Sequence, residues 1–198
     1  MVIYSCFVKP DSPPRYERVV TTARTKIGGL VFYDYVRAET DSKKSVLIVP
    51  GVVGTSEDFY ILDVVHSMHK QGFNVLVMNP LGPYDRDPQY ETSEKGLEIN
   101  DFSNNTHIAQ AVEQMRVLFG EDTEVYSIGF SLGSNYMLRH LGTHDESCPC
   151  RIKGALSISG AWHLMTAMTQ LHEQTLGIYD YYIKCRIMNP YMAGRYQY

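Results

Sequence analysis

Two hydrophobic patterns follow one another along the chain, and the change lies near residue 45. Before it, residues 17–22 and 30–37 hold strand-forming residues on either side of the turn pair Gly28-Gly29, and apolar and polar positions alternate through residues 31–36. This alternation predicts a hairpin at the edge of a sheet. After residue 45, short continuous apolar runs predict strands that are buried on both faces. These runs lie at residues 45–49, 73–78, 124–128 and 152–159.

Segments with apolar residues at helical spacing separate these runs. They lie at residues 56–70, 105–119 and 132–141, and a further amphipathic stretch extends from Gly160 to about residue 182. Strand–helix alternation of this kind favours an α/β fold with a mostly parallel, open sheet of about six strands. We therefore divide the chain into a core at residues 1–160 and a helical segment at residues 161–198. The polar loop at residues 79–104 is long enough to be either functional or disordered.

Composition and charge exclude several classes of function. The 198 residues include 18 Lys and Arg against 22 Asp and Glu, and a net charge of −4 does not suit a nucleic-acid-binding surface. No apolar run reaches the roughly 18–20 residues that span a bilayer. The first ten residues also lack the pattern of a signal peptide, so we expect any membrane contact to be peripheral.

The cysteines and glycines argue against a metal or a cofactor. Cys148 and Cys150 are too closely spaced for a structural zinc pair, and no GxGxxG sequence or phosphate-binding loop occurs. Four scattered cysteines in a chain of this length favour free thiols and an intracellular, reducing compartment.

The sequence Gly129-Phe130-Ser131-Leu132-Gly133 is the strongest candidate for chemistry, because it lies between an apolar run and a helical run. This spacing predicts a strained strand-to-helix turn that raises the Ser131 hydroxyl above the sheet, with Gly129 and Gly133 making room for the neighbouring backbone. The turn sets the N–H group of Leu132 at a helix N-terminus, where it can stabilise an oxyanion. The alternative is a tight glycine turn with a capping serine.

A second glycine-rich stretch, Pro50-Gly51-Val52-Val53-Gly54-Thr55-Ser56, follows the first buried strand. By itself it suits an ordinary strand-to-helix turn. Combined with a nucleophilic Ser131, it predicts that the N–H group of Val52 is a second oxyanion donor.

These stretches resemble the α/β-hydrolase branch that contains abhydrolase-domain proteins one, two and three and their plant and bacterial relatives. The branch reads P/H-G-L-T-G-x-S, N-x-R-G and G-x-S-x-G-G-N, and the matching stretches here read PGVVGTS, NPLGPYDR and GFSLGSN. The resemblance covers about residues 30–165 and implies serine-dependent hydrolysis of lipid esters, such as monoacylglycerols or medium-chain phospholipids. Residues 161–198 then resemble the start of a helical cap.

The departures from this branch are substantial. Leu81 replaces the Arg of N-x-R-G, and His107 stands where the branch carries an acidic residue. The branch places its catalytic Asp and His after two further strands, so they have no counterpart in a chain that ends at Tyr198, and the chain resembles a C-terminally truncated member. His163 follows the strand next to Ser131 and is the histidine we consider as a base.

Three hypotheses follow for the function. The chain is a serine hydrolase that acts on lipid or other esters through an acyl-enzyme at Ser131; it is the N-terminal part of a longer, active enzyme; or it is a non-catalytic, hydrolase-like subunit of a larger assembly. In the first case Leu164, Met165, Met168 and Leu171 line an acyl pocket or simply pack in the core. Without further strands, residues 152–159 form an open apolar edge, which a protein partner would cover.

Overall fold

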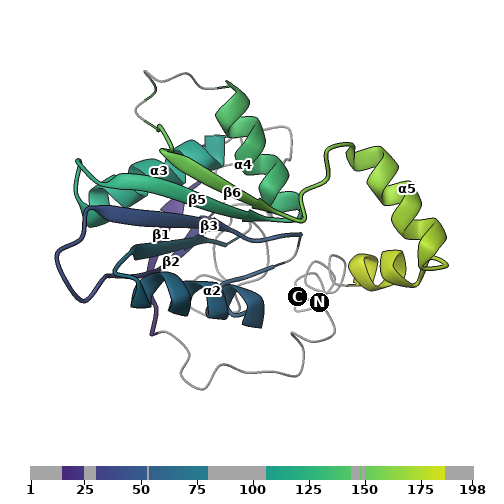
Figure 1. Cartoon of the computed structure of the whole chain (residues 1–198), viewed down its shortest axis with the longest axis horizontal. Coiled ribbons are helices and arrows are strands. Elements are labelled where there is room, and N and C mark those ends of the chain that lie inside the picture. Colours follow the sequence, from purple (N-terminus) through teal and green to yellow (C-terminus); the bar gives the residue numbers. More distant parts are fainter. Residues whose placement is uncertain are drawn as a thin grey trace, which may run out of the picture.

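The computed structural model describes residues 15–24, 30–52, 54–79, 106–143, 148 and 150–185. Along the chain, strands alternate with helices from residue 44 onwards (Figure 1). The elements are β1 (Glu17–Thr22), β2 (Leu30–Val36), β3 (Lys44–Val49), α2 (Phe59–Lys70), β4 (Asn74–Met78), α3 (Thr106–Phe119), β5 (Glu124–Phe130), α4 (Leu132–Thr143), β6 (Gly154–Ile158) and α5 (Leu164–Gln174).

The described strands form one six-stranded sheet in the order β1-β2-β4-β3-β5-β6. The first two pairings, β1 with β2 and β2 with β4, are antiparallel, and the remaining three are parallel. The prediction of an open, mostly parallel α/β sheet is therefore confirmed. Because β3 and β5 are neighbours, the loops that follow these two strands meet at the same edge of the sheet.

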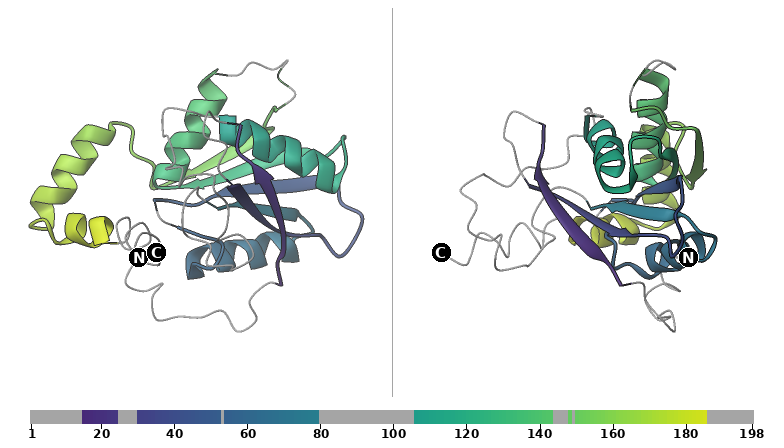
Figure 2. Two further views of the ribbon diagram at one scale, coloured as in Figure 1. Left: turned by 180° about the vertical axis from the view of Figure 1, so that it is seen from behind. Right: turned by 90° about the vertical axis from the view of Figure 1, so that its left-hand side faces the viewer.

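Helices cover both faces of the sheet, α2 on one side and α3 and α4 on the other (Figures 1 and 2). Alternate residues of β3 point to opposite faces of the sheet and so belong to two different hydrophobic clusters. On one face, Val46 and Ile48 pack against Ile61 and Val65 of α2. On the other face, Leu47 and Val49 belong to the cluster that includes the apolar side chains of α3. This double cover explains why β3 and β4 read as continuous apolar runs.

Strand β2 differs from the expected edge strand. It lies between β1 and β4, and its residues from Val31 to Tyr35 are buried. Asp34 is among them, with 1% of its surface exposed. Arg18 of β1 binds this carboxylate and compensates its charge, so the polar residue is accommodated inside the sheet.

Two helix boundaries also differ from the predictions. The first helix begins at Phe59, because residues 55–58 form a turn in which the amide of Asp58 donates to the carbonyl of Thr55. The amphipathic stretch after Gly160 is broken at Leu176 and Gly177, which have φ angles of 50° and 75°, and residues 178–185 then form a second helical piece.

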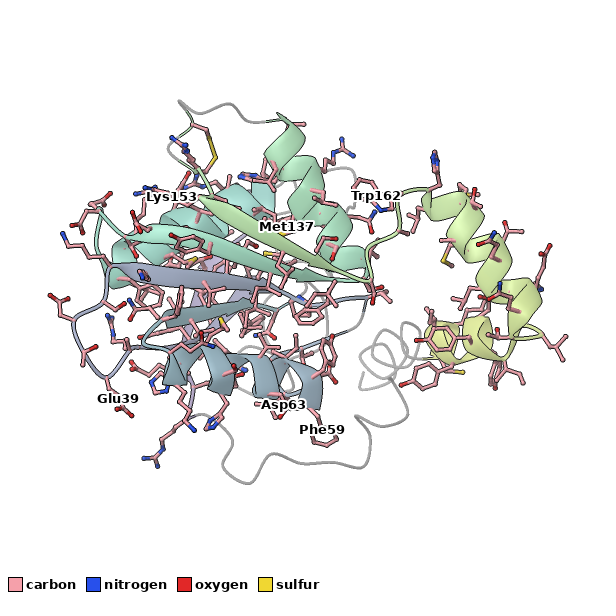
Figure 3. All side chains as sticks on the ribbon, viewed as in Figure 1. Glu39, Phe59, Asp63, Met137, Lys153 and Trp162 are labelled. Carbon is pink, nitrogen blue, oxygen red and sulfur yellow. A yellow bond between two sulfur atoms is a disulfide. The ribbon has the colours of Figure 1, made fainter. Side chains whose placement is uncertain are left out.

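The expectation of free thiols is wrong for two of the four cysteines. Cys148 and Cys150 are joined by a disulfide, which Figure 3 draws as a yellow bond. Their Cα atoms lie 5.2 Å apart, and the turn in which the Arg151 amide donates to the Cys148 carbonyl holds them together. Cys185 is free.

The loop expected to be functional or disordered, residues 79–104, lies outside the described residues except for Asn79. Within the described ranges, none of the helices has both the length and the apolar character needed to cross a bilayer.

The last strand and the segment after it leave apolar side chains in solvent. β6 is an outer strand of the sheet, and Leu156 on it is 54% exposed. Trp162 lies on the connection to α5 and is 89% exposed, and α5 itself stands beside the sheet with no buried residue (Figure 3).

Candidate active site

Ser131 is the single residue between β5 and α4. Its φ angle is 50°, in the left-handed region that side chains rarely adopt, and it is exposed. Its N–H group donates to the Ile158 carbonyl at 2.8 Å, and its carbonyl accepts from the Ser134 amide at 3.0 Å. The backbone is therefore held in a strained conformation at the end of the sheet, with the side chain directed away from the core.

Both glycines of the motif lie where a side chain does not fit. A Cβ atom on Gly129 would lie 2.7 Å from the Cα atom of Ser134 and 2.9 Å from the Gly133 carbonyl oxygen. A Cβ atom on Gly133 would lie 2.2 Å from the Pro50 oxygen and 2.3 Å from the Val49 oxygen. The first glycine lets α4 start close to β5, and the second lets α4 approach the end of β3.

The glycine-rich stretch after β3 lies against Ser131. A Cβ atom on Gly51 would contact the Ser131 Cβ atom at 3.2 Å and would lie 3.9 Å from its hydroxyl oxygen. Val52 follows in a turn closed by the Gly54 amide, which donates to the Gly51 carbonyl at 3.0 Å. The backbone next to Val52 thus lies beside the Ser131 hydroxyl.

Leu132 is the first residue of α4. The amides of a first helical turn have no acceptor within the helix, and the helix dipole adds positive character there. Among the described residues, the backbone bonds outside helices and strands include none that the Leu132 or Val52 amide donates.

Two residues of the motif that sequence reasoning left without a role attach β6 to this turn. The Ser134 hydroxyl donates to the Gly129 carbonyl at 2.5 Å, and it accepts from the Ile158 amide at 3.2 Å. The side-chain amide of Asn135 donates to the Ala161 carbonyl at 2.6 Å. Their place in GFSLGSN was the available signal, but Ile158 and Ala161, to which they bind, lie more than 20 residues away.

His163 is not joined to Ser131 by any hydrogen bond found among the described residues. It precedes α5 and is exposed, and its carbonyl accepts from the Ala167 amide. His163 lies two residues after Ala161, whose carbonyl is hydrogen-bonded to Asn135 of α4. The remaining described histidines include His172, whose Nδ1 atom contacts the Asp180 carboxylate at 2.5 Å.

Of the two expectations for the apolar residues of α5, an acyl pocket or packing in the core, core packing is wrong. Leu164, Met165 and Met168 of α5 are 45%, 80% and 44% exposed. They are solvent-facing because α5 extends beyond the sheet rather than over it (Figure 1).

The described residues show no three His, Cys, Asp or Glu side chains gathered closely enough to hold a metal ion. What this site contains is an exposed, conformationally strained serine that lies beside Gly51 of the loop after β3 and directly before the first residue of α4. That arrangement suits nucleophilic attack on a carbonyl and stabilisation of the oxyanion that results.

Comparison with known proteins identifies the family. The model of the alpha/beta hydrolase fold family matches residues 44–182, which is most of the chain. This chain belongs to the alpha/beta hydrolase fold family.

Among its relatives, the embryogenesis-associated protein EMB8 of Picea glauca is 29% identical over 70% of this chain and 28% of that protein. Phospholipase ABHD3 of Bos taurus is 24% identical over 73% of this chain and 33% of that protein. This chain thus spans about a third of the length of these relatives.

A solved structure shares the fold. The esterase Pf2001 of Pyrococcus furiosus matches with a TM-score of 0.56 and 19% identity, over 80% of this chain and 58% of that one.

Proposed function

We propose that this chain provides the nucleophilic part of a serine hydrolase that cleaves carboxylic esters through an acyl-enzyme at Ser131. The observation that carries the proposal is the φ angle of 50° at an exposed serine between β5 and α4, directly beside Gly51 of the loop after β3. A strained serine between a strand and a helix is typical of nucleophiles in this fold.

The reaction has two halves. The Ser131 oxygen attacks the ester carbonyl while a base takes its proton, the alcohol leaves, and water then hydrolyses the acyl-enzyme. During each attack the carbonyl oxygen becomes negatively charged, and the N–H groups of Val52 and Leu132 bind it. One such donor contributes roughly 10²–10³ in kcat in serine hydrolases.

Lipid esters are the substrate class we propose. One relative of this chain is named a phospholipase, and a serine hydrolase that takes such substrates must contact an apolar acyl chain. The exposed apolar side chains of Trp162, Leu164 and Met165 provide such a surface near the end of β6 and support peripheral contact with a lipid surface.

A base is the remaining requirement. Within the described residues, His163 is the histidine we propose to test first, because its segment is attached to α4 two residues earlier through Ala161. Replacement by Gln removes the titratable ring and keeps a polar side chain, so the expected result is loss of reaction at Ser131 without loss of the fold.

The experiment is labelling of the native protein with a fluorophosphonate probe, followed by intact mass measurement and mapping of the modified residue. We expect a single adduct on Ser131 that the Ser131→Ala variant abolishes. Ser159 provides a matched control, because it is also exposed, also follows a strand, and has a φ angle of 54°. Labelling of Ser159→Ala must equal that of the wild type.

The outcomes separate the sources of the base. Labelling of the 22.6 kDa chain that His163→Gln abolishes assigns the base to His163. Labelling only of a native protein heavier than 22.6 kDa assigns the base to residues outside this sequence. Absence of an adduct on Ser131 in every native form contradicts the enzymatic proposal.

A second function is favoured by the exposed β6 edge. Leu156 is 54% exposed on that outer strand, and edge strands of this kind pair readily with other chains. The corresponding proposal is a non-catalytic, hydrolase-like subunit whose protein partner covers β6. It predicts that the native protein is recovered in a complex and carries no fluorophosphonate adduct.

A further inference from the structure

A buried polar network lies behind the loop that carries Gly51 and Val52. At its centre is Asp34 of β2, whose carboxylate accepts from Nε and Nη2 of Arg18 at 2.6 and 2.8 Å. The same carboxylate accepts from the Ser56 hydroxyl at 2.5 Å and from the Asn79 side-chain amide at 2.8 Å. These four bonds satisfy a charged group that would otherwise be unfavourable in the interior.

Ser56 is the member of this network that belongs to the loop after β3, and all three of its polar groups are bonded. Its hydroxyl donates to Asp34, and its N–H group donates to the Asn79 side-chain oxygen at 2.9 Å. Its carbonyl accepts from the Tyr16 hydroxyl at 3.1 Å. Burial and the Asp34 charge raise the pKa of Tyr16 above its ordinary value, so this hydroxyl keeps its proton. Ser56 is 1% exposed and therefore has little freedom to move.

The position of Ser56 constrains Val52, four residues earlier. On one side, Val49 ends β3 with its carbonyl against Gly133. On the other side, Ser56 is bound to Asp34 of β2 and to Asn79, the residue that follows β4. Between these two anchors the Gly54 amide donates to the Gly51 carbonyl at 3.0 Å, which closes the turn that contains Val52.

We propose that Asp34 and Ser56 are positioning residues for ester hydrolysis: the network of Arg18, Asp34, Ser56 and Asn79 holds the loop so that the Val52 amide points at the oxygen bound next to Ser131. This inference rests on the proposed function and assigns it residues far from the chemistry in sequence. Neither side chain touches the substrate. Both act through the backbone between Gly51 and Ser56.

The need to fix the direction of the Val52 amide before the reaction explains why the charged Asp34 is buried behind this loop. An oxyanion donor is effective only when its direction is set before the reaction, and a displacement of 1 Å can reduce the rate by about 10²-fold. The Asp34 carboxylate binds two separate segments at once, the loop at Ser56 and the residue after β4, Asn79. An apolar residue would fill the space without fixing the orientation of either segment.

The test compares Ser56→Ala with Ser45→Ala. Ser45 is a matched control because it is also fully buried, with its hydroxyl bonded to the Thr123 hydroxyl at 2.6 Å. It lies at the opposite end of β3, away from Ser131. Each variant loses one buried hydroxyl, so a merely structural role predicts the same behaviour for both. Ser56→Thr, which keeps the hydroxyl, is the rescue variant, and Asp34→Asn replaces Ser56→Ala if the latter does not fold.

Two quantities are measured on the native full-length protein: the rate of fluorophosphonate labelling at Ser131, and hydrogen exchange in a peptide that covers residues 50–58. For Ser56→Ala we expect labelling to slow by roughly 10- to 100-fold at an unchanged half-saturating probe concentration. Exchange in that peptide should accelerate by at least about 10-fold. Ser45→Ala should leave both near the wild-type values, and Ser56→Thr should recover most of the labelling rate.

The hydrogen exchange measurement keeps this proposal separate from the proposed function. If Ser131 of the wild type does not react at all, the enzymatic proposal fails, and exchange in residues 50–58 still decides whether Ser56 holds the loop. Equal labelling and equal exchange in Ser56→Ala and Ser45→Ala overturn the inference, whatever the activity of the wild type.

Discussion

Replacement of Gly133 by alanine tests the close approach between α4 and the end of β3. A Cβ atom there would lie 2.2 Å from the Pro50 oxygen, 2.3 Å from the Val49 oxygen and 2.9 Å from the Pro50 carbonyl carbon. All three atoms belong to the backbone, so no rotation of a side chain can relieve the contacts. Either α4 or the end of β3 must move.

The size of the effect follows from these distances. Real Cβ atoms essentially never come closer than 3.0 Å, so the nearest contact must lengthen by about 0.8 Å. Overpacking of a well-packed interior destabilises proteins by about 1–3 kcal/mol and sometimes by more. The two carbonyl groups lie at the end of β3, a strand paired on both sides, which leaves little room for relaxation, and we expect a loss of at least about 3 kcal/mol. For a domain of this size the melting temperature should fall by roughly 6–12 °C.

The assay is urea denaturation of both forms, with Gly142→Ala as the matched control. Gly142 lies in the same helix, and a Cβ atom there would meet nothing within 4 Å. Alanine at that position should be neutral or stabilise the protein by up to about 1 kcal/mol, because it is the better helix former. If Gly133→Ala unfolds within 1 kcal/mol of the wild type, the close approach of α4 to Pro50 is refuted.

Two other predictions concern charged pairs. Arg18→Met leaves the buried Asp34 carboxylate without its cation and should reduce the free energy of unfolding by roughly 3 kcal/mol, measured in urea; a loss below 1 kcal/mol would argue against the pairing. Lys153 lowers the pKa of Glu124, so Lys153→Met should raise that pKa toward its usual range in an NMR titration. Because the pKa of Glu124 is lower in the folded state, the pair stabilises the fold at pH values above the unfolded pKa of Glu124. This contribution is lost as the pH falls through the folded pKa. The same Glu124 titration curve in the wild type and in Lys153→Met would contradict the prediction.

The candidate nucleophile could be predicted because its signal is local. Gly129, Ser131 and Gly133 are within five residues, and the apolar run before them and the helical run after them define the kind of turn they make. The structure has the strained φ angle at Ser131 and the close backbone contacts at both glycines. Their roles in catalysis stay predictions until labelling tests them.

The role of Asp34 was missed because its signal is not local. An Asp between two tyrosines in an alternating strand normally marks a solvated face. Its partners Arg18, Ser56 and Asn79 come from three other segments, and no spacing rule connects them. The prediction of free thiols was wrong for a local reason. It rested on a general rule about compartments, whereas the turn in which the Arg151 amide donates to the Cys148 carbonyl brings the sulfurs of Cys148 and Cys150 together.

By itself the sequence determined the order of strands and helices, the class of sheet, and the place of Ser131 between a strand and a helix. These features depend on periodicity and on residues within a few positions of one another. Only the tertiary structure decided how closely Gly51 approaches Ser131, that Asp34 is buried, and that α5 lies beside the sheet with its apolar residues exposed. Each of these depends on which strands become neighbours, and neighbours in a sheet are selected by packing between segments far apart in the chain.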